Sequence, residues 1–161
     1  MKVTSTSRNI RMSPKKVREV TRQIQGLSVV RAQAVLSAIP RKSARLVAKT
    51  LDSAIADAAH IRAEWTEEDI NDKAGKVRER IQDHTGEDGK LQRKVRQLKG
   101  ELARYEEYLD SEAKLAEDSL TIAEATAGAA RPLRRWRTRA RGGGSPIIKR
   151  TSHIRITLSD E

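Results

Sequence analysis

The sequence predicts an α+β protein with strands at both ends of the chain and helices between them. A Thr/Ser alternation over residues 2–12, and alternation of apolar and polar residues over 120–122 and 154–158, are typical of strands. Apolar residues at helical spacing fill most of the intervening chain. A long arginine-rich stretch separates the last two strands, so we expect these to form the base of a hairpin with an extended basic tip.

The composition favours a partner of opposite charge. The 161 residues carry a net charge of +11, and they include only four aromatic residues and no cysteine. The core is therefore small and aliphatic, and part of the stability is expected from a partner. Without cysteine there is neither a disulfide framework nor a thiolate metal site. No signal-peptide run or membrane-length apolar window is present, so we expect an intracellular, nucleic-acid-bound protein without a membrane partner.

The charge is divided between a basic framework and an acidic segment. Residues 61–118 hold 12 Lys or Arg and 16 Asp or Glu, whereas the rest of the chain holds 21 and 6. A shift this sharp indicates an inserted element. We therefore expect an RNA-binding domain formed by residues 1–60 and 119–161, with a hairpin tip at about 131–145, and an insertion at 61–118.

Three helices are expected after the first strand. Ser13 and Pro14 are suited to begin the first helix, and Gly26 to end it. Ser28 is suited to cap the second, and Pro40 separates the second from the third. The expected apolar positions are Val17, Val20 and Ile24, then Val29, Ala32, Leu36 and Ile39, then Ala44, Val47, Ala48, Leu51, Ile55 and Ala58.

The acidic segment has the pattern of two packed helices. Its second half repeats apolar residues at spacings of four and three, which is a coiled-coil seam. The seam positions are Leu91, Val95, Leu98, Leu102, Tyr105 and Leu109, with Ile70, Ala74, Val77 and Ile81 upstream. Residues 85–90 contain two glycines suited to a turn. An antiparallel helical hairpin is the simplest interpretation, and pairing with another chain is the alternative.

The arginine stretch has the character of a phosphate-binding segment. Six arginines and no acidic residue occur in residues 131–141. From Arg135 to Arg141 they alternate with other residues, which places four guanidinium groups on one face of an extended chain. Such a face repels itself and requires a polyanion, and guanidinium groups match phosphate oxygens. The glycines of residues 142–144 are expected to let the backbone turn or approach RNA closely.

Four motifs in order resemble the universal large-subunit ribosomal protein L twenty-two family. They are residues 11–18 (RMSPKKVR), 49–58 (KTLDSAIADA), 133–142 (LRRWRTRARG) and 149–154 (KRTSHI). The resemblance covers roughly residues 2–60 and 119–160. It implies a small three-stranded antiparallel sheet packed on three helices, with a long basic hairpin. It also implies a structural constituent of the large ribosomal subunit that binds its rRNA, supports assembly and lines the nascent-peptide exit tunnel with the hairpin.

The chain departs from the family pattern at the tip and in the middle. The family usually has proline at the position of Thr138 and arginine at the position of Gly143, so a more flexible and less charged tip is expected. The acidic segment replaces what is normally a short connection. Its interpretation stays open between an ornament that points away from rRNA and a docking site for a protein partner. Its negative charge argues against direct contact with RNA.

The candidate site follows from the arginines, the basic helix faces and the motifs. The expected rRNA-binding residues are Arg8, Arg11, Ser13, Lys15, Lys16, Arg18, Arg22, Lys49, Arg131, Arg134, Arg135, Trp136, Arg137, Arg139, Arg141, Lys149, Arg150 and His153. The expected tunnel-lining tip is Arg137, Thr138, Arg139, Ala140, Arg141, Gly142 and Gly143. Free amides at the start of the first helix add a phosphate site. Trp136 is expected either to stack on a base or to pack on its own hairpin.

Other classes of function find less support. His60, His84 and His153 lie in separate segments without ligand spacing, and no nucleophile–base pair is evident, so no metal, cofactor or enzymatic activity is expected. A helix-turn-helix DNA-binding regulator, with its turn at residues 25–28, is one alternative. An RNA-bound adaptor that recruits a partner through the coiled hairpin is another. The expected partners are large-subunit rRNA, neighbouring ribosomal proteins and the nascent peptide, in a cytoplasmic or organellar ribosome.

Overall fold

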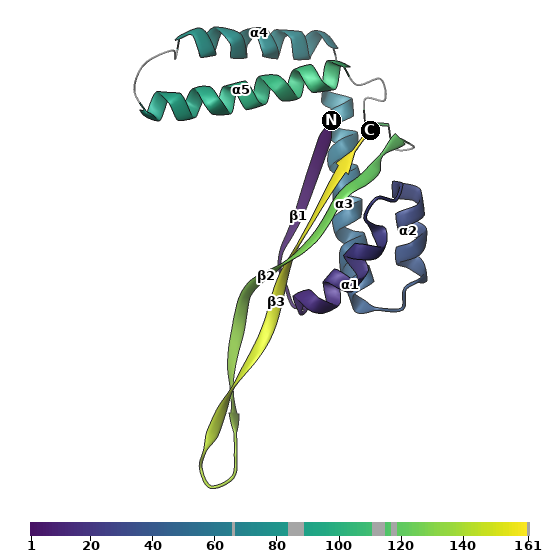
Figure 1. Cartoon of the computed structure of the whole chain (residues 1–161), viewed down its shortest axis with the longest axis vertical. Coiled ribbons are helices and arrows are strands. Elements are labelled where there is room, and N and C mark those ends of the chain that lie inside the picture. The colour runs from purple at the N-terminus through teal and green to yellow at the C-terminus, as the bar shows by residue number, and fades with distance from the viewer. Residues whose placement is uncertain (66, 84–88, 111–114, 117–118, 161) are drawn as a thin grey trace.

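Three antiparallel strands in the order β1-β3-β2 form the sheet on which the helices pack (Figure 1). The computed structural model describes residues 1–65, 67–83, 89–110, 115–116 and 119–160. The elements are β1 (Lys2–Ile10), α1 (Pro14–Ile24), α2 (Val29–Ala38), α3 (Lys42–Glu64), α4 (Glu67–Asp83), α5 (Gly89–Asp110), β2 (Thr121–Thr138) and β3 (Gly144–Ser159). The predicted α+β class and three-stranded antiparallel sheet are confirmed. No helix in the described ranges offers a membrane-spanning length of apolar sequence.

The last strand of the chain is the central strand of the sheet. Leu158 of β3 pairs with Val3 of β1 on one side and with Ile122 of β2 on the other. All three side chains are buried in one row that faces the helices. Ile154 and Ile156 continue this buried face along β3, so the alternation predicted for residues 154–158 is confirmed.

Helices α1 and α3 supply the other half of the core. α1 packs against β2 and β3, α3 packs against β1 and β3, and α2 packs on α3. Val17, Val47 and Leu51 are fully buried at this interface, as the helical spacing predicts. Each large aliphatic side chain buried in this way contributes about 1.5–3 kcal/mol, so the stability rests on aliphatic packing rather than on aromatic residues.

The turn between α1 and α2 is joined to the edge of the sheet. Gly26 has a φ of 80°, which is the left-handed conformation expected of a glycine that ends a helix. Its N–H donates to the carbonyl of Ile122 at 2.8 Å, and the N–H of Ile122 donates to the carbonyl of Leu27 at 2.9 Å. Backbone groups of the turn that follows α1 therefore form hydrogen bonds with the edge strand β2.

The strands differ from the sequence prediction in length. β2 and β3 extend as a paired ladder to Thr138 and Gly144, far beyond the predicted residues 120–122 and 154–158. Cross-strand backbone hydrogen bonds sustain this ladder where side chains show no apolar alternation. β1 ends at Ile10 rather than at residue 12, because a register shift follows Ser7 and Asn9 has a φ of 56°.

Helices α4 and α5 run antiparallel and pack along the predicted seam (Figure 1). Ile70, Ala74, Val77 and Leu98 are buried between them. An ion pair also crosses this interface, from Arg78 Nη2 to Glu106 Oε1 at 3.0 Å. The predicted turn at 85–90 lies mostly outside the described residues, and α5 has already begun at Gly89.

Three of the four aromatic residues fix the base of the helical hairpin to the rest of the molecule. The Trp65 ring lies 5.1 Å from that of Tyr105 and 5.3 Å from that of Tyr108, in tilted and edge-on arrangements that favour aromatic attraction. Beside them the amino group of Met1 forms ion pairs with Glu107 and Asp160. Ile70 and Tyr108 thus belong to the same buried cluster as the sheet.

Truncation of Tyr108 is expected to loosen this attachment. Its side chain is only 2% exposed, so Tyr108→Ala removes a buried ring and is expected to cost about 3 kcal/mol. Hydrogen exchange should quicken in α4 and α5 while the amides of β3 keep their protection. Tyr108→Phe retains the ring and serves as the control. Uniform loss of protection through the sheet would show that the cluster is not a local attachment.

Candidate nucleic-acid interface

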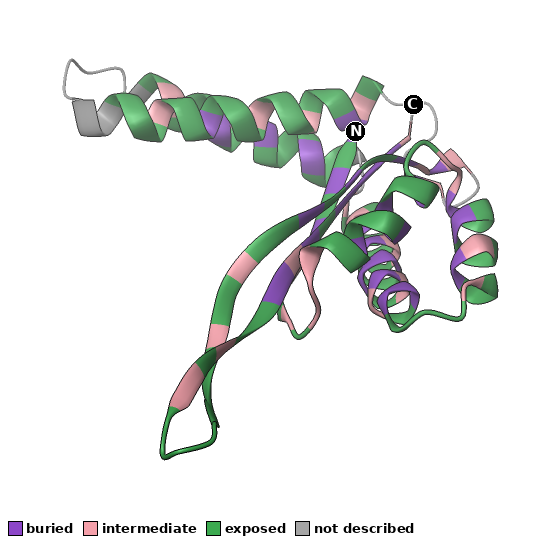
Figure 2. Cartoon of the chain, turned by 60° about the horizontal axis from the view of Figure 1, so that its bottom comes forward, coloured by how far each residue is buried: buried purple, intermediate pink, exposed green. Residues whose placement is uncertain are grey.

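The paired strands continue beyond the helices as a slender basic arm, defined here as residues 131–150 (Figure 1). Most of this arm is exposed, as the colouring of Figure 2 shows. Residues 125–159 contain nine Lys or Arg and no Asp or Glu. Within the described residues, no cation of the arm forms an ion pair. The arm therefore presents uncompensated positive charge on a scaffold held together by backbone hydrogen bonds.

A register shift marks the point where the arm leaves the sheet. It falls between Ala130 and Leu133 of β2, a stretch that includes Pro132, which has no N–H to donate. The carbonyl of Arg131 accepts a hydrogen bond from the Thr151 hydroxyl at 2.6 Å. This side-chain contact replaces a ladder bond and keeps the arm continuous with the sheet.

The tip of the arm is a short hydrogen-bonded turn. The Gly143 N–H donates to the Ala140 carbonyl at 3.3 Å, and the Arg139 N–H donates to the Gly143 carbonyl at 2.8 Å. Arg141 and Gly142 have φ values of 56° and 70°, the combination that joins twisted antiparallel strands most readily. The predicted four-arginine face is therefore wrong in part. Extended backbone ends at Thr138, so Arg139 and Arg141 lie in the turn.

Trp136 packs on its own hairpin and still presents a free surface. A Cβ atom placed on Gly144 would lie 2.1 Å from the indole Nε1, so the ring occupies the space that this glycine leaves. At the same time the tryptophan is 70% exposed. The two predicted roles are therefore compatible, since packing against Gly144 leaves the outer side of the indole open to stack on a base.

A second group of predicted residues surrounds the base of the arm. α1 packs against β2 there, and Arg18 Nη2 donates to the Ala127 carbonyl at 3.2 Å. The Asn9 N–H donates to His153 Nδ1 at 3.2 Å, which brings the end of β1 to the same place. The basic residues of this group and of α3 are exposed: Arg8, Arg11, Lys15, Lys16, Arg18, Arg22 and Lys49.

The beginning of α1 is left open. Ser13 occupies the capping position with extended backbone, but its hydroxyl forms no capping hydrogen bond. The Ser13 carbonyl instead accepts from the N–H groups of Lys16 and Val17. An uncapped helix N-terminus beside exposed lysines favours an anion such as phosphate.

Sequence reasoning missed one basic residue of the sheet. Arg155 of β3 is exposed, and its neighbours Ile154 and Ile156 are buried against the helices. Alternation along the strand therefore places Arg155 on the open face of the sheet. The signal was present in the sequence, because Arg155 is a polar position of the strand predicted at residues 154–158. Arg41 is also exposed, but its Nη1 forms an ion pair with Glu19 Oε2 at 2.6 Å.

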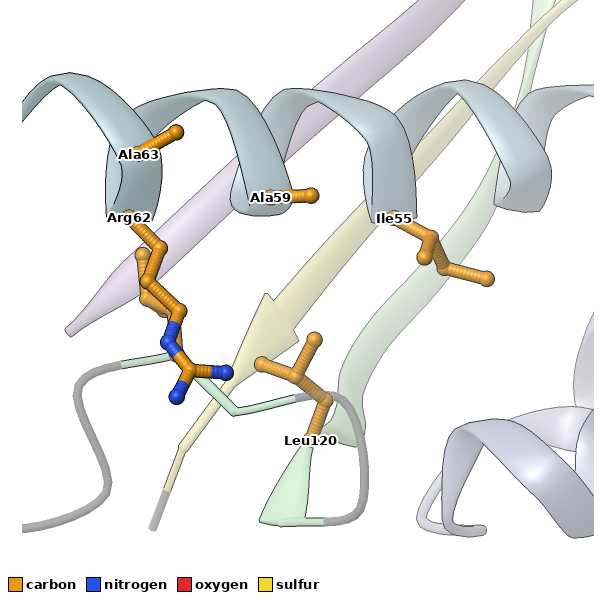
Figure 3. Close-up of a pocket in the computed structure, with 6 residues that line it drawn as sticks. Ile55, Ala59, Arg62, Ala63 and Leu120 are labelled. Carbon is orange, nitrogen blue, oxygen red and sulfur yellow. The ribbon is translucent and has the colours of Figure 1, made fainter.

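The hollow between α3 and the residues that precede β2 is not lined by residues suited to catalysis or metal binding. It measures about 380 Å³ and is lined by Ile55, Ala59, Arg62, Ala63, Leu115 and Leu120 (Figure 3). None of these side chains is a usual nucleophile, general base or metal ligand. Among the described residues, no group of three or more His, Asp or Glu gathers where a metal ion would bind.

An α+β body with an acid-free basic arm and basic residues around its base defines a nucleic-acid-binding protein of structural type. The chain belongs to the ribosomal protein L22p/L17e family, whose family model matches residues 5–87 and 88–159. The two matched stretches together span both the sheet and the helical hairpin.

Two bacterial relatives are similar along nearly the whole chain. The large ribosomal subunit protein uL22 of Opitutus terrae is 32% identical over 160 residues, which is 99% of this chain and 96% of the relative. The large ribosomal subunit protein uL22 of Akkermansia muciniphila is 29% identical over 161 residues, which is 100% of this chain and 98% of the relative. Both alignments run through residues 61–118, and both relatives are close to this chain in length.

Substitution of Gly144 is expected to displace Trp136. In Gly144→Ala the new methyl group would overlap the indole, so the ring must rotate away from the hairpin. The NMR signal of the Trp136 indole N–H should shift, while that of Trp65 stays in place. Gly143→Ala is the matched control, because its Cβ would meet only the Ala140 carbonyl oxygen at an ordinary 3.5 Å. An unchanged Trp136 signal in Gly144→Ala would contradict this packing.

Proposed function

We propose that the basic arm and the basic residues around its base bind large-subunit rRNA, and that the tip of the arm lines the nascent-peptide exit tunnel. The family assignment makes the protein a structural, non-enzymatic constituent of the large ribosomal subunit, with rRNA and neighbouring ribosomal proteins as its partners. The observation that carries the finer proposal is the exposure of every arginine of the arm without one acidic neighbour.

The proposed mechanism is neutralisation of phosphates. Arginines of the arm repel one another in the free protein, and each phosphate contact relieves that repulsion and releases condensed counterions. Guanidinium groups bind phosphate oxygens in a fixed, two-pronged geometry, which fixes the position of the arm. If six to eight phosphates are contacted, log K should fall with log salt with a slope of roughly −4 to −7.

The tip is the proposed tunnel-lining element. Residues 137–143 stand at the end of the arm farthest from the body (Figure 1). Gly143, where the family pattern has arginine, gives this tip one charge fewer than the resemblance implies, and Thr138 stands where that pattern has proline. We propose that Arg137, Arg139 and Arg141 hold rRNA, and that the small side of the turn, Ala140, Gly142 and Gly143, faces the peptide path.

We also propose that residues 61–118 form an inserted arm rather than part of the rRNA-binding body. Its base is strongly acidic, since residues 61–72 and 100–118 together hold twelve Asp or Glu and three Lys or Arg. A basic neighbouring protein of the ribosome is the proposed partner of this base. The alternative of a DNA-binding regulator finds little support, because α2, which would be its recognition helix, carries a single basic residue, Arg31.

Neutralisation of the tip tests the role of the arm. The triple variant Arg137→Gln, Arg139→Gln, Arg141→Gln is expected to reduce the magnitude of the salt slope for large-subunit rRNA by about two to three. The matched control is Arg31→Gln, Arg45→Gln, Arg62→Gln, which removes the same charge from exposed positions of α2 and α3. If the two triple variants reduce the salt slope equally, the effect depends only on net charge, and the proposed role of the arm is wrong.

A further inference from the structure

The helical hairpin is divided electrically along its length. Residues 73–99, which form its distal half, hold nine Lys or Arg and four Asp or Glu. The acidic character that marks the segment as a whole therefore belongs to its base alone. The net charge of the segment conceals a basic end and an acidic end.

The basic character concentrates on the first half of α5. Residues 89–100 include five Lys or Arg and no acidic residue. Arg93, Lys94, Arg96 and Lys99 are all exposed. None of these four forms an ion pair with the described residues, whereas Arg78 is paired with Glu106. Four unpaired cations within two turns repel one another, so this surface is suited to an anionic partner.

The exposed face of α5 also carries a stripe of residues with a glycine, Gly100, near its middle. Leu98 is buried and Val95 and Leu102 are half-buried, which fixes the side of α5 that faces α4. Arg93, Gln97, Gly100 and Arg104 follow at spacings of four, three and four, so they lie on the opposite side of the helix. Arg96 and Lys99 lie to one side of this stripe, between it and the side that faces α4.

Nothing in the described part of the chain accounts for Gly100. A Cβ atom built at this position meets no atom within 4 Å, and glycine inside a helix is less stable than alanine. The residue nevertheless lies in the middle of the exposed basic stripe. A glycine there allows the backbone of α5 to approach a partner closely, between flanking arginines.

The stripe lies on the side of the helical hairpin that is turned toward the body. Figure 1 shows α5 on the side of the helical hairpin that is turned toward the basic arm, with α4 outside it. Arg104, at the end of the stripe, lines a hollow with Lys2, Thr4 and His60 in the corner between the hairpin and the body. An RNA that extends from the arm along the body toward the helical hairpin would therefore reach α5 before α4.

We propose that this α5 face, formed by Arg93, Arg96 and Lys99 around Gly100, binds the sugar-phosphate backbone of rRNA. The proposal rests on the proposed function, because it is the bound arm that brings RNA to this side of the molecule. RNA is favoured over a protein partner because the exposed residues from 92 to 100 include no apolar side chain, and a protein interface has an apolar or aromatic centre. The acidic base repels the same RNA, which restricts the contact to the distal half.

Matched triple variants test the proposal in the full-length protein. Arg93→Gln, Arg96→Gln, Lys99→Gln should reduce the magnitude of the salt slope for large-subunit rRNA by about two to three and lower its affinity on the order of tenfold at moderate salt. The control Lys73→Gln, Lys76→Gln, Arg80→Gln removes the same charge from exposed positions of α4 and should change the slope by less than half as much. Glutamine has a helix propensity close to those of arginine and lysine, so both variants should keep their helix content.

Gly100→Ala separates binding from folding. The added methyl group has open space within the chain, so the unfolding temperature should rise while rRNA affinity falls. Equal slopes for the α5 and α4 variants would overturn the proposal. So would unchanged rRNA binding with loss of a neighbouring protein from reconstituted subunits, which would make the face a protein interface. If the tip variant lowers affinity and the α5 variant does not, only this inference fails; if neither does, the proposed function fails first.

Discussion

The structure depends on the pairing of β2 with β3, which continues from the sheet to the tip of the arm. The same two strands form part of the core sheet and both sides of the basic arm. Ile154, Ile156 and Leu158 bury one end of β3 beneath the helices, and the other end of that strand stands in solvent beside the arginines of β2. The aliphatic row around Leu158 therefore fixes the base of the basic arm, which has no core of its own. The hydrogen-bonded ladder of β2 and β3 holds the rest of the arm as far as the tip.

The positive charges of the basic arm repel one another and therefore destabilise the arm. Eight cations without an acidic neighbour oppose the formation of the arm, and only the backbone ladder and a few contacts such as that from Thr151 to Arg131 hold it. We therefore expect phosphate contacts to stabilise the arm when the proposed rRNA partner is bound.

The body could be predicted from the sequence more completely than either arm. Helical spacing located Val17, Val47 and Leu51 in the core, and Gly26 at the end of α1, because apolar periodicity and positive φ leave direct marks in a sequence. The length of β2 and β3 left a weaker mark, the alternation of arginines from Arg135, because arginines and glycines continue the ladder mainly through backbone bonds. Trp65 is far from Tyr105 and Tyr108 along the chain, and the spacing of the two tyrosines is ordinary for a helix. The contact between the three rings therefore depends on tertiary structure.

The two arms present similar charge by opposite structural means. In the basic arm most residues of both strands are exposed, and the backbone ladder holds them with only a few side-chain contacts, so charge density reaches its highest value where a core is absent. In the helical hairpin a buried seam of Ile70, Ala74, Val77 and Leu98 provides a core, and this frees the outer face of α5 to carry cations without loss of folding. A net charge computed for the whole segment hides this arrangement, because acidic residues at its base outnumber the distal cations. The position of a charge on a folded surface, rather than the sum over a segment, decides which surface a polyanion can contact.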